Sequence, residues 1–155
     1  GKEMSHFYNR DLPYGEVGEK VVLDLIKLKY PKAHKITGNH SEYDIMIPET
    51  NKTVEVKRDA ISHLTGNAFI ETRCNGTESG LNITTADYWT YMTNEKICLV
   101  TPHDIRLCIE HNNINETGHL IQGKEIDAYV IPLKFLYNYC IKTYSLNEEQ
   151  LCQLN

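Results

Sequence analysis

The stretch from residue 42 to residue 58 constrains the fold more than any other part of the chain. Its pattern predicts two short β-strands joined by a turn that begins at a proline and ends near an asparagine, two residues that turns favour. Because side chains alternate between the faces of a strand, Glu55 and Lys57 share one face, and the valines beside them share the other. If Asp44 on the first strand lies opposite Glu55 or Lys57, three charged groups meet on one face.

Such a group of charges is costly to bury unless its members act together. Asp44 and Glu55 would repel each other and raise each other's pKa unless a divalent cation neutralised them. Lys57 beside them can hold a water molecule or stabilise a developing negative charge. The pattern therefore predicts a metal site, and its alternative is an edge strand whose alternating charges face water and oppose aggregation.

Asp44, ten intervening residues and Glu55-Val56-Lys57 resemble the D…ExK signature of the PD-(D/E)XK nuclease superfamily. Tyr43 stands where the family's name has a proline, a position at which the family often departs from its pattern. The resemblance implies that Asp44 and Glu55 bind Mg²⁺ or Mn²⁺, with the backbone carbonyl of Val56 as a third ligand. It also implies that Lys57 positions the attacking water or stabilises the transition state, and that the products carry 5′-phosphate and 3′-hydroxyl ends.

A helix is predicted from about residue 13 to about residue 30, where Pro31 ends it. Glu19 falls at the edge of its buried side, at a rotation of about 100° per residue. Taken alone, Glu19 is a partly exposed acid that the helix dipole favours near the helix start. In the family, a first-helix glutamate preceded by glycines is a common extra active-site acid, and residues 15–19 match that pattern. The resemblance implies that Glu19 holds a second metal, with Glu16 as the rival.

Further elements follow from hydrophobic periodicity and from proline and glycine positions. Strands are expected over residues 33–37, 68–73, 96–101 and 127–131. Helices are expected over residues 86–92, 103–111 and 132–143. Irregular structure is expected over residues 4–12, 38–41, 74–81 and 112–118 and in a short polar tail, and residues 59–67 are expected to form a loop that can include a helical turn. This order predicts one α/β (α+β) domain over residues 1–155, a sandwich with a central mixed sheet flanked by helices, which is the restriction-endonuclease-like layout of the superfamily.

The residues expected to contact nucleic acid are Lys35, Arg58, Asn67 and Arg73. Lys35 can approach a phosphate, and a solvated lysine is the alternative. Glu71 and Arg73 share a face of their predicted strand, where they either pair on the surface or face DNA beside the metal.

A second run, from Gly66-Asn67 through Ser79-Gly80 to residues 86–89, looks like sequences in phage-type members of the superfamily. The aromatic side chains of Tyr88, Trp89 and Tyr91 could stack on bases. The alternative is that they pack in the core against the sheet.

Composition narrows the class of protein. The net charge of −5 argues against a protein that coats DNA by bulk charge. Neither a membrane-spanning apolar run nor a signal peptide is found, so a cytoplasmic protein with no membrane contact is expected. Five cysteines without a CxxC pair fit free thiols in a reducing compartment better than a disulfide framework. A zinc site built from cysteines and histidines is the alternative, but no familiar ligand spacing supports it.

The expected function is a Mg²⁺- or Mn²⁺-dependent endonuclease that hydrolyses DNA phosphodiester bonds. Small members of the superfamily include Holliday-junction resolvases and phage recombination endonucleases, usually homodimers, as well as small restriction enzymes. The resemblance thus implies a homodimer, encoded by a virus or phage, that is selective for branched or recombination DNA. The alternative is a non-catalytic nucleic-acid-binding or assembly protein that retains the fold, against which the intact set of acids and lysine argues.

Overall fold

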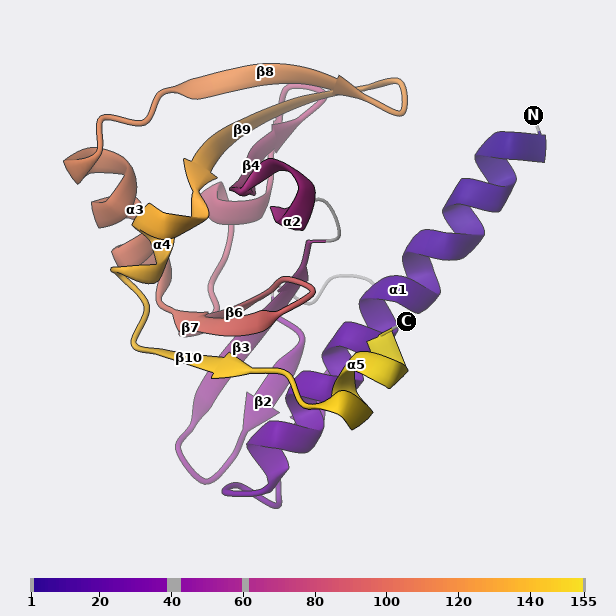
Figure 1. Ribbon diagram of the computed structural model, residues 1–155, viewed down its shortest axis with the longest axis vertical. Coiled ribbons are helices and arrows are strands. Elements are labelled where there is room, and N and C mark those ends of the chain that lie inside the picture. The colour runs from indigo at the N-terminus through magenta and orange to yellow at the C-terminus, as the bar shows by residue number, and fades with distance from the viewer. Residues whose placement is uncertain (1, 39–42, 60–61, 155) are drawn as a thin grey trace.

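The computed structural model describes residues 2–38, 43–59 and 62–154, and of residues 2–14 and 63 it describes the backbone alone. Two β-sheets form the centre of the molecule and helices lie against them (Figure 1). The predicted mixed α/β class is confirmed, and the second sheet is a feature that the sequence does not predict. No helix in these described ranges is long and apolar enough to cross a membrane.

The first sheet is mixed, with the strand order β1-β2-β3-β6-β7-β10. Its strands are β1 (His34–Lys35), β2 (Ile45–Ile47), β3 (Lys52–Arg58), β6 (Tyr88–Met92), β7 (Lys96–Val100) and β10 (Lys142–Ser145). Neighbours are antiparallel except β3 and β6, which run parallel. The predicted hairpin is confirmed, because Ile45 pairs with Val54 and Ile47 with Lys52.

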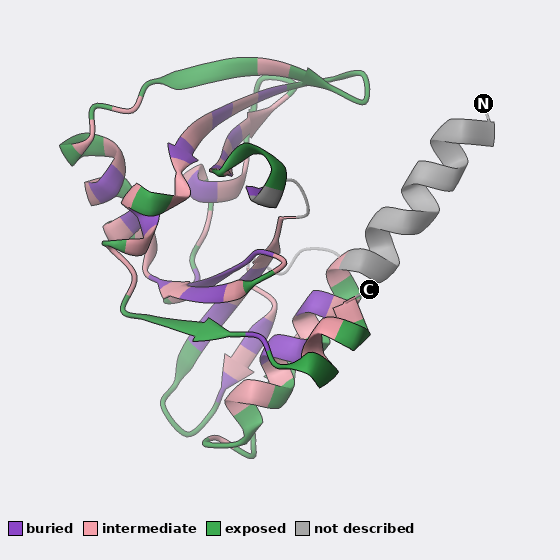
Figure 2. Ribbon diagram, viewed as in Figure 1, coloured by how far each residue is buried: buried purple, intermediate pink, exposed green. Residues whose placement is uncertain are grey.

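The second sheet is antiparallel, with the order β5-β4-β9-β8. Its strands are β4 (Asn67–Cys74), β5 (Thr77–Glu78), β8 (Glu116–Ile121) and β9 (Lys124–Pro132). The strands predicted over residues 68–73 and 127–131 are confirmed as β4 and β9. The loop predicted over residues 112–118 is wrong from Glu116 onward, because β8 forms the largely exposed edge of this sheet (Figure 2).

Helix α1 (Lys2–Lys27) lies along one face of the first sheet, with α5 (Glu148–Leu154) beside it (Figure 1). The other helices are α2 (Ser62–Thr65), the 3₁₀-helix η1 (Gly80–Asn82), α3 (Pro102–His111) and α4 (Leu133–Tyr137). One buried cluster, which includes Val21 and Val54, lies between α1 and the first sheet. A second cluster, which includes Trp89 and Ile70, lies between the two sheets. The first sheet is therefore covered on both faces (Figure 2).

This double coverage explains why the helix predicted over residues 86–92 is wrong. Residues 88–92 form strand β6, in which all but the first side chain are buried. Trp89 and Tyr91 belong to the cluster between the sheets, and Met92 belongs to the cluster under α1. A strand buried on both faces lacks the alternation of apolar and polar residues, so its short apolar run is not distinguished from a helix by periodicity.

The ends of the chain also differ from the prediction. Residues 4–12, predicted to be irregular, belong to α1, which continues through Pro13 and ends at Lys27. A proline is best tolerated in the first helical turn, so it was a natural but misleading start signal. The helix predicted over residues 132–143 ends at Tyr137, and Lys142–Ser145 pair with β7 as β10.

The predicted polar tail is wrong, because it contains α5. Asn147 caps this helix: its Oδ1 accepts a hydrogen bond from the backbone N–H of Gln150 at 2.8 Å, and Oε1 of Gln150 accepts one from the N–H of Asn147 at 2.9 Å. Reciprocal bonds of this kind form a capping box, a signal that the sequence contains. Leu146, Leu151 and Leu154 then pack against the cluster under α1.

The other predictions are closer to the structure. Residues 96–100 form β7, and residues 102–111 form α3, whose first turn is capped by the hydroxyl of Thr101. The strand expected over residues 33–37 is the shorter β1. The expected loops over residues 59–67 and 74–81 contain α2 and, in the second, β5 and the start of η1. Of the loop at 38–41, residues 39–41 lie outside the described ranges.

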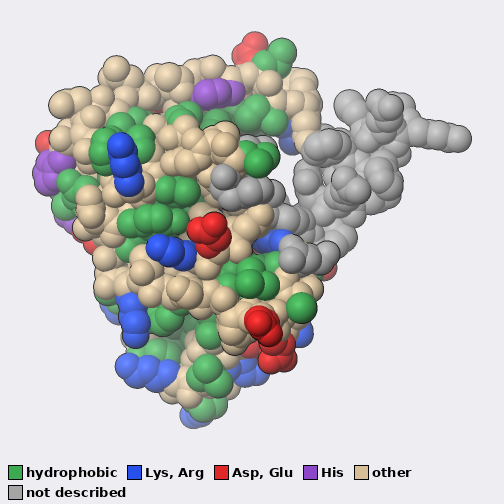
Figure 3. All heavy atoms as spheres, in the orientation of Figure 1, with side chains coloured by type: hydrophobic (Ala, Val, Ile, Leu, Met, Phe, Trp, Pro, Cys, Tyr) green, Lys and Arg blue, Asp and Glu red, His purple; other side chains and the backbone are tan. Residues whose placement is uncertain are grey.

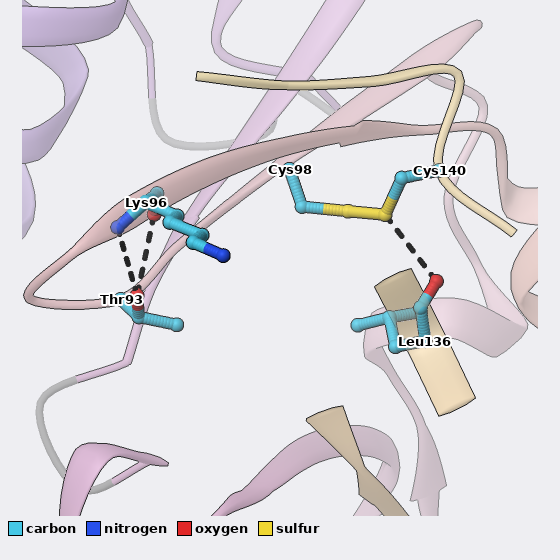
Figure 4. The surroundings of a disulfide bond; sticks show 5 residues. All are labelled: Thr93, Lys96, Cys98, Leu136 and Cys140. Atoms are coloured by element: carbon cyan, nitrogen blue, oxygen red, sulfur yellow. Dashed lines mark hydrogen bonds between the residues drawn. A yellow bond between two sulfur atoms is a disulfide. The ribbon is translucent and has the colours of Figure 1, made fainter. Parts of the chain in front are cut away.

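A disulfide joins Cys98 on β7 to Cys140, which lies just before β10 (Figure 4). Their Cα atoms are 6.0 Å apart and 42 residues separate them in the sequence. The prediction of free thiols is therefore wrong for this pair, because spacing along the chain does not reveal that the two strands are neighbours. The remaining cysteines, Cys74, Cys108 and Cys152, are free.

Gly80 explains part of the second sequence run. Its φ is +49°, and a Cβ atom at this position would lie 2.1 Å from the carbonyl oxygen of Glu71. Ser79 next to it donates a hydrogen bond from its hydroxyl to Glu71 at 2.9 Å. The residues of this run therefore fasten η1 to strand β4.

We expect the Gly80→Ala variant to have a much lower free energy of unfolding than the Gly76→Ala variant. Both residues have positive φ, but a Cβ at Gly76 meets nothing within 4 Å. Gly76→Ala therefore pays only the left-handed backbone cost of about 1–2 kcal/mol, whereas Gly80→Ala adds a backbone clash worth about 1–3 kcal/mol. Urea unfolding of both variants measures the difference, and equal stabilities would contradict the close approach to Glu71.

Candidate active site

Asp44 lies directly before β2 and is fixed by three hydrogen bonds. Its backbone N–H donates to Val54 at 2.9 Å, and its carbonyl accepts from Ile36 at 2.8 Å. Its side-chain Oδ2 accepts from the backbone N–H of Val56 at 2.7 Å. Because the ladder between β2 and β3 stops at Ile45, the Asp44 carboxylate takes the place of a strand partner for Val56. The register sets Asp44 opposite Glu55, as the sequence predicts.

Glu55 and Lys57 lie on the same face of β3, which is the face opposite Val54. Oε1 of Glu55 and Nζ of Lys57 are 3.4 Å apart, and the two side chains are 18% and 39% exposed. Nζ of Lys57 also lies 5.3 Å from the centre of the Trp89 ring on the neighbouring strand. Strand β3 therefore presents a largely buried carboxylate beside a more accessible ammonium group.

Helix α1 brings Glu19 to the same place. Oε2 of Glu19 lies 3.0 Å from Nζ of Lys35 on β1. This oxygen is buried and, within the described part of the chain, receives no hydrogen bond of good geometry, so the contact is an ion pair rather than an aligned hydrogen bond. The rival Glu16 is exposed. Glu19 is thus the helix carboxylate that meets Asp44.

A small residue allows α1 to approach this closely. A Cβ atom on Gly18 would lie 3.1 Å from Cδ of Arg58, which is tight for a side chain that is itself held in place. Arg58 donates from Nη2 to the carbonyl of Leu154 in α5 at 2.7 Å. The glycine before Glu19 therefore lets α1 rest on β3, and Arg58 ties both elements to α5.

The pKa values of two of these acids, Glu19 and Glu55, are raised. Burial above all raises the pKa of Glu55 from 4.5 to about 7, Lys57 opposes the rise, and the charges of Asp44 and Glu19 add to it. Burial likewise raises the pKa of Glu19, Lys35 opposes this, and Asp44 adds to it. The ion pair with Glu19 in turn raises the pKa of Lys35. Asp44 is therefore close enough to both glutamates to disfavour their charged forms.

The donor chemistry of this group fits a hard divalent cation. Three carboxylates interact across α1, the start of β2 and β3, and one buried carboxylate oxygen lacks a well-aligned donor. Oxygen donors of this kind suit Mg²⁺ or Mn²⁺. Among the side chains that the structure describes, however, no three Asp, Glu, His or Cys residues already have the arrangement that would hold an ion. Lys35 and Lys57 pair with the carboxylates instead.

The predicted nucleic-acid contacts do not all gather at these acids. Lys35 does, through Glu19. Arg58 is directed to the α5 carbonyl. Asn67 and Arg73 lie at opposite ends of β4 in the second sheet, where Arg73 is within ion-pair distance of Glu78, Glu116 and Asp127. Since Ser79 rather than Arg73 bonds Glu71, the two residues do not form the surface pair that was one alternative.

Basic side chains lie elsewhere as well. Lys27, Lys29, Lys32 and Lys52 are exposed near the C-terminal end of α1 and the β2–β3 turn. Figure 3 shows lysine and arginine side chains at this lower end of the molecule. Such a group of lysines offers favourable charge for a nucleic acid backbone despite the negative net charge.

Of the three aromatic residues that could have stacked on bases, Trp89 and Tyr91 pack in the core, whereas Tyr88 is half-buried and lines a groove under α1. Trp89 and Tyr91 are 1% and 2% exposed. Indole Nε1 of Trp89 donates to Thr84 at 3.0 Å, and the Tyr91 hydroxyl donates to Asp59 and accepts from the N–H of Phe69. Burial and the neighbouring Asp59 raise the pKa of Tyr91. These bonds join β3, β4 and β6.

Asp87 connects β6 to β3, a role that the sequence does not predict. Its carboxylate accepts hydrogen bonds from the N–H and the hydroxyl of Thr53, at 2.9 and 3.1 Å. This sets the register of β6 against β3. An aspartate directly before an aromatic run is a weak signal, because its partner lies 34 residues away.

A large groove lies on the other face of the first sheet and has different chemistry. Its volume is about 760 Å³, and most of the residues that line it are apolar and come from α1, β2, β3, β6, β7 and β10. Lys29 and Lys52 also line it. Val54 lines it, so Glu55, the next residue on β3, points away from it. Because none of its lining residues is an acid, we place the candidate site at the carboxylates and not in this larger cavity.

No protein-family model, curated protein or solved structure matches the chain.

The raised pKa of Glu55 predicts that, without metal, stability falls as pH rises. The folded state holds the Glu55 proton up to about pH 7, whereas the unfolded chain releases it near 4.5. Between these values the folded state binds more protons, so the free energy of unfolding decreases with pH, by an amount on the order of 1–3 kcal/mol.

Glu55→Gln removes this titration, so we expect a flatter stability profile from pH 4.5 to 7 and a more stable protein at pH 8. Urea unfolding in EDTA across this range measures it, with the exposed Glu125→Gln as control. A pH dependence of stability that Glu55→Gln leaves unchanged would contradict the burial of the Glu55 charge.

Proposed function

We propose that the chain is a divalent-metal-dependent endonuclease that hydrolyses DNA phosphodiester bonds. The observation that carries the proposal is the meeting of Glu19, Asp44, Glu55 and Lys57, residues from α1 and from both strands of the β2–β3 hairpin, around the backbone of Val56. A structural role alone does not explain this arrangement, because it places carboxylates where they repel one another.

The strand arrangement supports a restriction-endonuclease-like fold as part of the same proposal. An antiparallel run β1-β2-β3 is followed by β6 parallel to β3, with α1 on one face. The resemblance of residues 44–57 to the PD-(D/E)XK signature implies such a core. The extra antiparallel sheet is then an insertion between β3 and β6, completed by β8 and β9.

Each residue has a distinct task in the proposed reaction. Asp44, Glu55 and the carbonyl of Val56 would hold Mg²⁺ or Mn²⁺. Glu19 would hold a second metal ion. The metal, when bound, lowers the pKa of a water ligand and offsets phosphate charge. Lys57, whose side chain is 39% exposed beside Glu55, orients the attacking water or stabilises charge on the phosphate.

Substrate and assembly belong to the proposal too. We propose a homodimer that acts on branched or recombination DNA, in keeping with the phage-type resemblance of residues 66–89. The exposed lysines near the β2–β3 turn would contact the DNA backbone, which positions DNA without reading its sequence.

One observation favours an alternative, a non-catalytic nucleic-acid-binding or assembly protein. Lys35 and Lys57 already pair with Glu19 and Glu55, so the fold balances part of the acidic charge without a metal. This alternative predicts neither metal binding nor cleavage.

We expect labelled DNA to be cut with Mg²⁺ or Mn²⁺ and not with EDTA, to leave 5′-phosphate ends, and to be cut most readily as a four-way junction. Lys57→Ala should lower the cleavage rate by about 100-fold or more, because one preorganised charge contributes that much to a hydrolytic transition state. The assay compares linear, single-stranded and junction DNA.

Lys124→Ala is the matched control, since Lys124 is also an exposed lysine but begins β9 in the second sheet, away from the acids and the turn lysines. Cleavage that survives equally in Lys57→Ala would refute the assigned role, and the absence of cleavage in the wild type on all three substrates would support the binding protein.

Metal binding should also raise the melting temperature without any DNA. At a concentration 100 times the Kd, the ion stabilises the fold by about 2.7 kcal/mol. Asp44→Asn should abolish this gain while the protein stays folded, because the amide oxygen can still accept the N–H of Val56. Differential scanning fluorimetry with Mn²⁺ and EDTA tests it, and an equal shift in Asp44→Asn would place the ion elsewhere.

A further inference from the structure

Lys35 occupies an unusual position for a surface lysine. It ends β1, which pairs with β2 so that Lys35 is opposite Ile45, the residue after Asp44. Its Nζ reaches Glu19 at 3.0 Å, where the Glu19 side chain is 21% exposed and that of Lys35 is 46% exposed. A cation from a neighbouring strand thus sits on the one site carboxylate that comes from α1.

This lysine and a divalent cation would use the same oxygen. Oε2 of Glu19 is buried and is the atom that Lys35 contacts. A hard cation takes carboxylate oxygens as ligands, and two positive charges near one oxygen repel each other. The side chain of Lys35 can leave this position, because it is 46% exposed and lies at the surface of the molecule.

We propose that Lys35 is a built-in competitor of the metal: it neutralises Glu19 before a divalent cation binds, is displaced from Glu19 by that cation, and then contacts a DNA phosphate. The inference rests on the proposed function and adds a device to it. Lys35 is a positioning residue that sets metal affinity through Glu19, and it couples metal loading to DNA binding.

The positions of the two lysines relative to their carboxylate partners explain why Lys35, and not Lys57, has this task. Lys57 pairs with Glu55 from two positions along the same strand, at 3.4 Å, so it stays beside Glu55 whether or not the pair is made. Lys35 and Glu19 belong to separate elements, β1 and α1. Breaking their contact lets the Lys35 head group move away from Glu19, which then keeps Asp44 as its charged neighbour.

The experiment measures the Kd of Mn²⁺ by titration calorimetry, without DNA, in full-length wild type, Lys35→Met and Lys35→Arg. We expect Lys35→Met to bind Mn²⁺ about three to ten times more tightly, the range for losing a half-exposed competing charge. Lys35→Arg retains the charge and should restore an affinity near that of the wild type.

Two further variants make the result specific. Lys20→Met removes a lysine next to Glu19 in the sequence whose partner is Asp24, at 4.0 Å, and should leave the Kd within twofold. In a Glu19→Gln background, Lys35→Met should no longer tighten binding. DNA binding is measured with Mn²⁺ in a protein that carries Lys57→Ala, so that the DNA is not cut. In this background, Lys35→Met should weaken the binding of junction DNA severalfold.

An unchanged or weaker Mn²⁺ affinity in folded Lys35→Met would overturn the inference, as would tightening that persists in the Glu19→Gln background. Should Lys35→Met and Lys35→Gln both fail to fold, Lys35 is a structural residue and the inference is equally wrong. A wild type that binds no Mn²⁺ would instead defeat the proposed function itself, which separates the two failures.

Discussion

The hydrogen bond from the N–H of Val56 to the carboxylate of Asp44 is the contact on which the site depends. Strand β2 stops pairing with β3 at Ile45, and a buried N–H without an acceptor would cost about 1–3 kcal/mol. Asp44 supplies the acceptor at 2.7 Å. The same bond holds the carboxylate opposite Glu55. A single interaction therefore ends the hairpin ladder and builds the acidic group, so fold and site are not separable at this point.

The acids bring an energetic conflict that the lysines resolve only partly. Burial of Glu55 and Glu19 disfavours their charged forms, and Asp44 adds to the penalty of both. Lys57 and Lys35 each compensate one acid from the more exposed side. An ion pair that is open to solvent contributes little stability, so the compensation is incomplete. A site that lacks positive charge in this way is suited to a ligand with two positive charges, a divalent cation.

The hairpin and its acids could be predicted from the sequence because their signals are local. Period-two alternation places Glu55 and Lys57 on one face, and the helical rotation of 100° places Glu19 at the edge of α1. Strand β6 could not be recognised, because burial on both faces removes its alternation. The disulfide and the bond between Asp87 and Thr53 join residues 42 and 34 positions apart, and such distances have no periodic signature. Asn147 and Gln150 did carry a capping signal for α5, which the polarity of the tail concealed.

The position of Glu19 depends on contacts that reach the far end of the chain. Gly18 leaves room for the Arg58 side chain, and Arg58 bonds the carbonyl of Leu154 at the end of α5. Leu151 and Leu154 pack on the same cluster that holds Val21 and Val22 of α1. Three segments, one from each end of the chain and one from its middle, therefore fix where α1 crosses β3. Because Asp44 and Glu55 belong to the hairpin whereas Glu19 belongs to α1, the third acid of the site is in place only when the terminal helices have docked.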